Sequence, residues 1–396
     1  MTLRVRILAA CGLSLLTLTV GVTVAGAADL LEVYKRAQEN DPQIREADAN
    51  RLASMEARPQ ARAALLPTLT ATGNVDRFNT ESERTAADVS EGELIQVTST
   101  SKADDVGSHT YAFRLTQSVF RWDRWAALHR ADKQVAQAEV DYKAAEQNLL
   151  SRTAQRYFDV LAAADTLKAA QASLEAFSRQ LEQADKRFEV GLIAITDVQE
   201  ARAARDQASA AVIAAKRSVA STQEFLRELT GEAFKDLSEP GADMPLKTPD
   251  PASEDQWVNV ALEQNLSLIS ARLQTDIAKE DVRVARAGHL PSIDLVAQSS
   301  RDKDSGDGVT RRSNGQIIPS SADGFSNLDT IGLQVTVPIY SGGATQSQVR
   351  QRVYLHRAAR ERSERTARET ERATRDAYLG VISEISRVQA LRQAQE

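Results

Sequence analysis

A long internal repeat constrains the fold of this 396-residue chain more than any other feature of its sequence. Residues 37–69 align without a gap on residues 261–293, at a constant offset of 224 positions, and nine positions are identical. In the first segment these are Ala37, Glu39, Ala47, Glu56, Ala61, Arg62, Ala63, Leu66 and Pro67. Further matches follow at offsets of 220 and 221: residues 115–120 on 335–340, and Tyr157 and Val160 on Tyr378 and Val381. Such a period is far too long for a solenoid unit, so the chain consists of two related halves.

Each half contains the same elements in the same order. A helix is followed by a Leu-Pro pair, an alternating strand, a polar loop, a second alternating strand and a very long helix. The repeat predicts a signal peptide over residues 1–27, a first copy over 28–230, a linker over 231–255 that contains four prolines, and a second copy over 256–396. The second copy ends before the position equivalent to Gly191, so we expect it to be truncated before its hairpin tip.

The N-terminal segment has the pattern of an export signal. Arg4 and Arg6 precede a nearly uncharged apolar run over residues 7–24, and Ala25-Gly26-Ala27 fits a cleavage site. If the run were retained, it would be just long enough to anchor the chain in a bilayer. The only cysteine, Cys11, lies in this segment, so the mature chain would form no disulfide. Without the two arginines, 47 basic residues face 55 acidic ones, and the resulting net charge of −8 argues against a nucleic-acid partner.

Four segments alternate between apolar and polar residues: 68–75, 111–119, 293–298 and 331–339. Segments of about ten residues with this alternation are the weak but recognisable pattern of strands in outer-membrane barrels. The residues that we expect to face the membrane are Tyr111, Phe113, Leu115, Val119, Ile331, Leu333, Val335 and Val337. A soluble sheet with one solvated face would show the same alternation.

Two features favour membrane strands over a soluble sheet. Each pair of strands is joined by a long polar loop, at residues 77–108 and 300–327, and barrels of this kind carry long external loops. Four strands cannot close a barrel by themselves, because the smallest barrels have about eight. An open sheet edge is forbidden in lipid. The chain would therefore have to oligomerise, and three copies would together supply twelve strands.

The long helices show coiled-coil periodicity. Residues 124–190 contain neither glycine nor proline, and apolar residues recur every three or four positions from Tyr157 to Phe188. This predicts a helix of roughly 100 Å that ends at Gly191. A second helix follows at once, and Thr196 to Gln199 fits a capping box with Thr196 as the N-cap. Together the two helices are predicted to form an antiparallel hairpin.

The turn of this hairpin is apolar. Leu192, Ile193 and Ile195 lie in it, far along the chain from any other apolar cluster. They could close the end of the hairpin, or they could form a docking point for another protein. The sequence favours neither interpretation.

No pattern of catalytic or ligand-binding residues stands out. The sequence contains only four histidines, and none has a second ligand at the spacing of a metal site. There is no nucleophile elbow, phosphate-binding loop or dinucleotide fingerprint. We therefore expect that the protein is not an enzyme and that it binds no cofactor and no metal.

Several segments resemble the TolC family of outer-membrane efflux and secretion ducts. Residues 190–202 resemble the first hairpin tip of that family, residues 115–120 and 337–343 its strand-to-helix joins, and Leu66-Pro67 and Leu290-Pro291 its helix-to-strand joins. The resemblance implies a mainly α fold with β, in which duplicated antiparallel coiled-coil helices accompany four membrane strands per chain. In a homotrimer these would form a twelve-stranded β-barrel continued by an α-helical barrel. The expected location is the outer membrane of a Gram-negative bacterium, with the helices extending into the periplasm.

The resemblance also implies a function and partners. Such a duct gives substrates passive passage to the exterior, as part of a tripartite efflux pump or a type I secretion system. Its partners would be a periplasmic adaptor (membrane fusion) protein, an inner-membrane pump of the RND or ABC type, and outer-membrane lipid. The residues expected at the adaptor-docking tip are Val190, Gly191, Leu192, Ile195, Thr196, Asp197 and Val198. Asp197 is also the nearest candidate for the acidic gate of the family.

Two alternatives remain open. The chain could be a soluble periplasmic coiled-coil scaffold whose strands form a small sheet, or it could be the adaptor itself, which also has a long hairpin. Adaptors are not expected to carry two copies of a strand–loop–strand unit.

Overall fold

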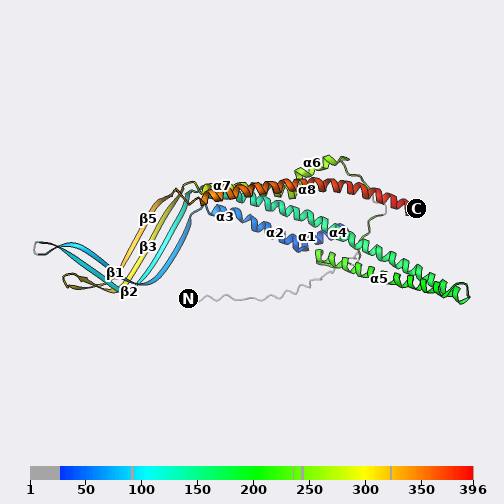
Figure 1. The fold of residues 1–396 in the computed structure, drawn as a ribbon, viewed down its shortest axis with the longest axis horizontal. Coiled ribbons are helices and arrows are strands. Elements are labelled where there is room, and N and C mark those ends of the chain that lie inside the picture. The colour runs from blue at the N-terminus through cyan, green and yellow to red at the C-terminus, as the bar shows by residue number, and fades with distance from the viewer. Residues whose placement is uncertain (1–26, 91–92, 235, 242–244, 322, 396) are drawn as a thin grey trace, which may run out of the picture. The chain divides into compact units, whose positions relative to one another are not determined.

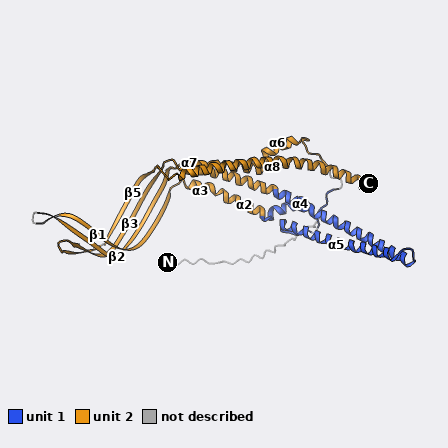
Figure 2. Ribbon diagram, in the orientation of Figure 1, with its two compact units in different colours: residues 1–42, 148–244 blue, residues 43–147, 245–396 orange. Residues whose placement is uncertain are grey.

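A computed structural model describes residues 27–395, except 91–92, 235, 242–244 and 322. Nearly all of the predicted signal peptide therefore lies outside the described residues. Within the part of the chain that is described, none of the helices combines the length and the apolar character of a membrane span. The chain divides into two compact units, one made of residues up to 42 with 148–244 and the other of 43–147 with 245–396 (Figure 2).

The first unit is helical. It contains α1 (Leu30–Asn40), α5 (Ile195–Thr230) and the C-terminal part of α4 (Trp122–Glu189). α1 begins at the N-cap Asp29, whose carboxylate accepts a hydrogen bond of 2.7 Å from the N–H of Glu32. All three helices contribute to one buried cluster: Ala28, Val33, Tyr157, Val160 and Leu226. This cluster holds the base of the predicted hairpin together.

The hairpin of α4 and α5 buries a seam of small and branched residues on α5. The buried positions are Val198, Ala201, Ala208, Val212, Ala215, Leu226, Leu229 and Thr230. On α4, Leu181 is buried, but Phe177 and Phe188 of the predicted seam remain 37% and 41% exposed. The alanines let the two helices approach closely, so α4 and α5 run side by side as expected from the sequence (Figure 1).

The second unit contains α2 (Pro42–Met55), α3 (Ala57–Ala63), α6 (Glu254–Gln264), α7 (Leu266–Ala287), α8 (Ala344–Gln395) and the N-terminal part of α4. α2 and α3 contact that part of α4: the Arg51 guanidinium lies 4.9 Å from the centre of the Tyr142 ring, and Arg58 reaches Asp132 at 3.0 Å. Both α6 and α7 contact α8. The Thr275 hydroxyl of α7 donates a hydrogen bond of 3.2 Å to the carbonyl of Ala359 on α8. Arg375 of α8 reaches Glu254 at 2.7 Å, which ties α6 to the same helix.

The sheet of the second unit is antiparallel throughout. Its strands are β1 (Thr68–Ser90), β2 (Glu93–Phe120), β3 (Ser292–Arg312), β4 (Ile317–Ser321) and β5 (Gly324–Thr336). β1 pairs with β2, and β2 pairs with one edge of β3. β4 and β5 pair with consecutive stretches of the other edge of β3. The sheet is therefore four strands wide, as the four alternating segments predict (Figure 1).

The predicted polar loops at residues 77–108 and 300–327 are largely strand, so this part of the prediction was wrong. β1 and β2 remain paired as far as Ser90 and Glu93, and β3 extends to Arg312. These extensions are polar on both faces, so they show no alternation that would reveal a strand. Their regular pairing comes from backbone hydrogen bonds, which depend little on side-chain polarity. One close approach favours a glycine, because a Cβ at Gly306 would lie 3.0 Å from the Cα of Val106.

Candidate functional site

The pairing register sorts the side chains of the sheet onto two faces. Paired residues on neighbouring strands point to the same face. Four rows of one face, each read across the sheet, are Gly73, Tyr111, Arg301 and Asn327; Ala71, Phe113, Ser299 and Asp329; Leu69, Leu115, Ala297 and Ile331; and Gln117, Leu295 and Leu333. Near the helices, Ile293 pairs with Val335 on this face. Apolar residues therefore dominate the half of this face that lies next to the helices.

The opposite face is mainly polar, although Ala112, Val296 and Leu328 also lie on it. One of its rows consists of Thr70, Arg114, Gln298 and Thr330, and another of Asn74, Thr110, Asp302 and Ser326. Along β3 beyond Gln298, residues of this face are the less exposed ones, and Ser300 is only 6% exposed. A curved sheet crowds the side chains on its concave side. We therefore call the polar face the concave face and the apolar face the convex face.

The structure brings together six of the eight residues predicted to face the membrane. Tyr111, Phe113, Leu115, Ile331, Leu333 and Val335 all lie on the convex face. Val119 lies at an irregularity between Ser118 and Phe120 in the pairing of β2 with β3. Val337 lies just beyond the last residue of β5. Both remain more than half exposed, next to the helices.

Aromatic residues flank the apolar rows, and of those named below the sequence interpretation had predicted only Tyr111 to face the membrane. Phe120, Trp122 and Tyr340 are 39%, 49% and 87% exposed where the strands meet the helices. Tyr111 and Phe325 lie on the convex face farther from the helices, and they are 60% and 83% exposed. Aromatic girdles on both sides of an apolar band are typical of membrane barrels, so their spacing around the alternating segments could have identified them.

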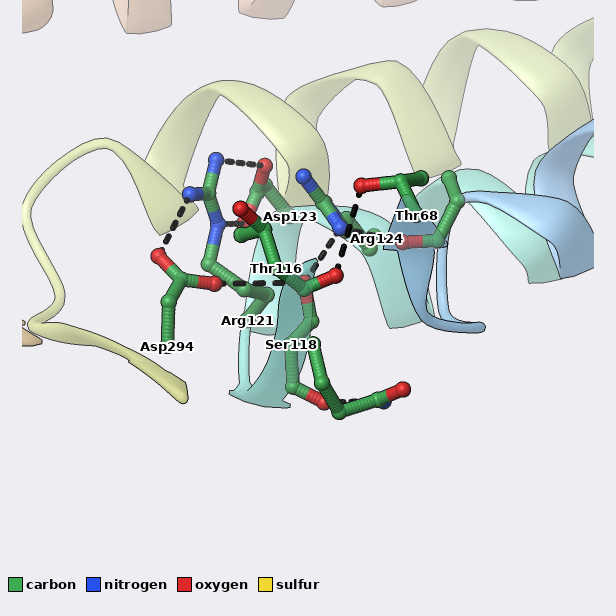
Figure 3. A network of polar contacts seen from close by, with 9 residues as sticks. Thr68, Thr116, Ser118, Arg121, Asp123, Arg124 and Asp294 are labelled. Carbon is green, nitrogen blue, oxygen red and sulfur yellow. Dashed lines mark hydrogen bonds and ion pairs between the residues drawn. The ribbon is translucent and has the colours of Figure 1, made fainter. Parts of the chain in front are cut away.

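A polar network fixes the join between β2 and α4 (Figure 3). Arg121 reaches a carboxylate oxygen of Asp294 at 3.3 Å and one of Asp123 at 3.3 Å. The pKa of Arg121 is raised, mainly because its guanidinium group donates a hydrogen bond to Asp123. Ser118 donates a hydrogen bond of 3.2 Å to Asp294 and accepts one from Arg124.

This network lies at the concave face. Asp294 pairs with Ser118 and Gln334 in the register of that face. Beside Arg121 a pocket of about 530 Å³ is lined by further charged residues, including Arg130, Asp281 and Arg352. Arg130 pairs with Asp281 at 3.0 Å. The charges at this join are thus mostly used to hold strands and helices in place.

At the hairpin tip, α4 ends in a regular C-terminal turn. Gly191 has φ +76°, a left-handed conformation that glycine adopts without strain. The N–H of Gly191 donates to the carbonyl of Phe188 at 2.9 Å, and the N–H of Leu192 donates to that of Arg187 at 2.9 Å. These two bonds are those of a Schellman motif, which satisfies the last carbonyls of α4.

The predicted capping box was wrong. α5 begins at Ile195, so its N-cap is Ala194 and Thr196 lies in the first turn, where it is exposed. Alanine has no side-chain acceptor and cannot cap the helix. Asp197 instead accepts a hydrogen bond of 3.3 Å from the N–H of Ala194. Asp197 thus supplies the half of the box that the sequence assigned to Gln199.

The apolar residues of the tip divide into two groups. Ile193 packs against a cluster of Leu181, Val198 and Ala201, and Val198 is only 2% exposed. These side chains close the end of the hairpin. Val190, Leu192 and Ile195 are 69%, 73% and 50% exposed. Of the three apolar residues predicted in the turn, Ile193 thus helps to close the end of the hairpin, whereas Leu192 and Ile195 do not pack into this cluster.

Within the described part of the chain, no group of three or more histidine, cysteine, aspartate and glutamate side chains could hold a metal ion.

Relatives of this chain are recognisable over most of its length. The family described as outer membrane efflux protein matches residues 33–232 and 257–396. The outer membrane protein TolC of Escherichia coli (strain K12) is 33% identical over 388 residues, which cover 96% of this chain and 74% of the relative. The alkaline protease secretion protein AprF of Pseudomonas aeruginosa is 27% identical over 369 residues, which cover 92% of this chain and 72% of the relative.

Solved structures share the fold. The Campylobacter jejuni CmeC outer membrane channel superposes with a TM-score of 0.67 at 18% identity, over 92% of this chain and 72% of that one. The outer membrane protein VceC of Vibrio cholerae has the same TM-score and identity, over 92% of this chain and 82% of that one. These structures confirm the predicted combination of long helices with an antiparallel sheet. By its family match and its similarity to TolC, this chain belongs to the outer membrane efflux protein family.

Proposed function

We infer that this chain is an outer membrane channel for efflux or type I secretion. Membership of the outer membrane efflux protein family supports this function, as does the similarity to TolC and AprF. The observation that carries it is the pair of faces on one sheet, apolar on the convex side and polar on the concave side. A sheet with these faces can close around water while its outer surface meets lipid. The family is one of channels and not of enzymes.

We propose that the working form is a homotrimer. Among the described residues, β1 pairs only with β2, and β4 and β5 pair only with β3. Both outer edges of the sheet therefore carry backbone groups without a strand partner. Inside a bilayer each such group would cost several kcal/mol, so the edges need strands from other copies. Three copies of a sheet that is four strands wide would close a barrel of twelve strands.

We propose further that the hairpin tip docks a periplasmic adaptor protein, which connects the channel to an inner-membrane pump of the RND or ABC type. Val190, Leu192 and Ile195 form an exposed apolar group there. Apart from its neighbours in the chain, no described residue comes within 4 Å of the Cβ position of Gly191, so the backbone at the turn is open to a partner. Thr196 and Asp197 stand exposed on the next turn and could give such a contact its polar part.

The channel function is tested by expressing the full chain and fractionating the membranes. We expect the protein in the outer membrane, as a detergent-dependent trimer, and we expect ion conductance after reconstitution into a planar lipid bilayer. Light scattering corrected for bound detergent measures the oligomer. A monomer that remains in solution without detergent would contradict the channel and would favour a soluble periplasmic scaffold.

The assignment of the two faces is tested with single cysteines in a Cys11→Ser background. Leu333 on the convex face and Gln334 on the concave face are neighbours in the sequence, so each is the matched control of the other. We expect Leu333→Cys to react with a lipid-soluble maleimide and Gln334→Cys with a water-soluble one. The reverse pattern would contradict the proposed orientation.

A further inference from the structure

Four consecutive residues of β3 alternate in the sign of their charge: Arg301, Asp302, Lys303 and Asp304. Alternate residues of a strand point to opposite faces. The register places Arg301 and Lys303 on the convex face and both aspartates on the concave face. The sheet therefore separates the two charges, with the cations on the same side as the apolar rows.

Aromatic residues accompany the two cations. Arg301 pairs with Tyr111 on β2, and Lys303 pairs with His109 on β2 and Phe325 on β5. Directly paired residues have Cβ atoms about 4.5–5.5 Å apart, so these side chains are immediate neighbours. Basic and aromatic side chains together are suited to the boundary between water and hydrocarbon.

The two cations form no ion pair with any residue that the structure describes. Among the residues that the structure describes, no carboxylate oxygen lies within 4.0 Å of Arg301 or Lys303, whereas Arg121, Arg130 and Arg375 each form ion pairs within that distance. On the convex face, Asp329 lies one row nearer to the helices than Arg301 and two rows nearer than Lys303. Arg301 and Lys303 are both exposed. Their charges are thus available to a ligand outside the chain.

The distance of the two cations from the helix end of the sheet matches the thickness of the apolar band of a membrane barrel. From Ile293, in the apolar row beside the helices, to Lys303 is a step of ten residues, or about 33 Å along a strand. A strand tilt of about 40° reduces this to roughly 25 Å along the membrane normal, which is the height of the apolar band in such barrels. Lys303 therefore falls at the end of the band that lies away from the helices, and Arg301 just inside it.

We propose that Arg301 and Lys303 bind the phosphate groups of a lipid in the outer leaflet, while the acyl chains of that lipid cover the apolar rows of the convex face. This inference rests on the proposed function, in which the convex face meets the membrane. The continuity of cations, aromatic rings and apolar rows matches an anionic amphiphile better than a soluble anion. Tyr111 and Phe325 pack beside its headgroup region.

The test measures the affinity of the purified full chain for lipid A, a glycolipid with two phosphates, in mild detergent. We compare the parent with Arg301→Gln/Lys303→Gln. A basic residue at an anionic membrane surface contributes a factor of about five, so we expect roughly thirtyfold weaker binding for this variant. Binding of the parent should also weaken as the salt concentration rises.

Two matched variants serve as controls. Asp302→Asn/Asp304→Asn alters the same strand at the neighbouring positions, but on the concave face, and we expect it to bind lipid A at least as tightly as the parent. Arg301→Lys/Lys303→Arg keeps the two charges and should retain affinity within about threefold. Loss of binding in the first control would show that strand structure, and not the cations of the convex face, governs the affinity.

Two further probes distinguish the possible ligands. One is dephosphorylated lipid A, and the other is inorganic phosphate as a competitor. Equal binding of the dephosphorylated lipid would overturn the proposed phosphate contact, and equal competition by inorganic phosphate would overturn the lipid as its source. Conductance is measured on every variant. If Arg301→Gln/Lys303→Gln keeps both its conductance and the parent's affinity for lipid A, this inference alone is overturned. A parent chain that forms no channel overturns the proposed function.

Discussion

The convex face of the sheet and the seam of the α4–α5 hairpin contain the same kinds of side chain in opposite states. Ile331 and Leu333 on the sheet are 77% and 67% exposed. Val198 and Leu226 on the hairpin are each 2% exposed. A helix can bury its apolar stripe against the next helix of the same chain, whereas no second layer covers the convex face of this sheet in the part of the chain that is described. Apolar residues that the chain leaves exposed thus mark where its surroundings complete the structure.

The largest expected effect comes from placing a charge on the convex face. Ile331→Arg should cost about 2–4 kcal/mol for each chain, because an arginine near the middle of the membrane must leave water. We expect less protein in the outer membrane and a trimer that dissociates in milder detergent. Thr330→Arg lies at the neighbouring position on the concave face, and it should leave the amount of protein in the outer membrane and the stability of the trimer nearly unchanged. Equal losses in the two variants would show that the convex face does not meet lipid.

Shortening a buried side chain of the hairpin should lower the free energy of unfolding of a single chain by a similar amount. Leu226→Ala removes a side chain from the buried cluster around Tyr157, and similar substitutions cost about 2–5 kcal/mol. Ile213→Ala lies on the same helix at a side chain that is 67% exposed, so a change below about 0.5 kcal/mol is expected. Chemical denaturation followed by circular dichroism measures both. A large effect of Ile213→Ala would indicate that a further surface of α5 is buried in the assembly.

A smaller effect is expected at the turn of the hairpin. Gly191→Ala places a Cβ on a backbone with φ +76°, which costs about 1–2 kcal/mol, although no atom obstructs the side chain. Gly191→Asn should recover part of this loss, because asparagine tolerates the left-handed conformation. Thermal unfolding of the purified protein provides the comparison. Equal stability of all three proteins would mean that the turn changes its backbone conformation in solution.

The smallest effect depends on pH. Burial raises the pKa of Tyr157, whose hydroxyl donates to the carbonyl of Ser238 at 2.6 Å. The folded state therefore favours the neutral phenol, so this contribution is complete below the unfolded pKa of about 10 and is lost as the pH rises through the folded value. The free energy of unfolding should fall above pH ~10. Tyr157→Phe should be less stable at neutral pH but show a shallower fall, and an equally steep fall would contradict this assignment.

Much of the fold could be predicted because its signals are local. Alternation at residues 331–335 identifies a strand, and the stretch from Val198 to Leu229 identifies a helix with one apolar side. The extensions of β1 to β3 could not be predicted, since their side chains are polar on both faces. The capping of α5 by Asp197 was missed because Thr196 and Gln199 fit the usual pattern equally well, and only the position of the first helical residue distinguishes them.

For the candidate site, the sequence indicated which residues alternate but not which of them share a face. That Leu115 lies beside Leu69 and Ala297, and that Arg301 lies beside Tyr111, depends on the register of strands that are distant in the chain. The division of the tip into buried Ile193 and exposed Leu192 likewise depends on how the Schellman turn aims each side chain. No periodicity of a short turn can encode that direction.

By itself, the sequence determined the duplication, the apolar and polar alternation of the strands, the glycine that ends α4 and the family to which the chain belongs. These properties arise from neighbouring residues and from similarity along the chain. Only the tertiary structure decided which strands are neighbours, which face is concave and on which face Arg301 and Lys303 of β3 lie. Those properties depend on hydrogen bonds between segments far apart in the sequence, and a shift of one residue in their pairing would reverse every face.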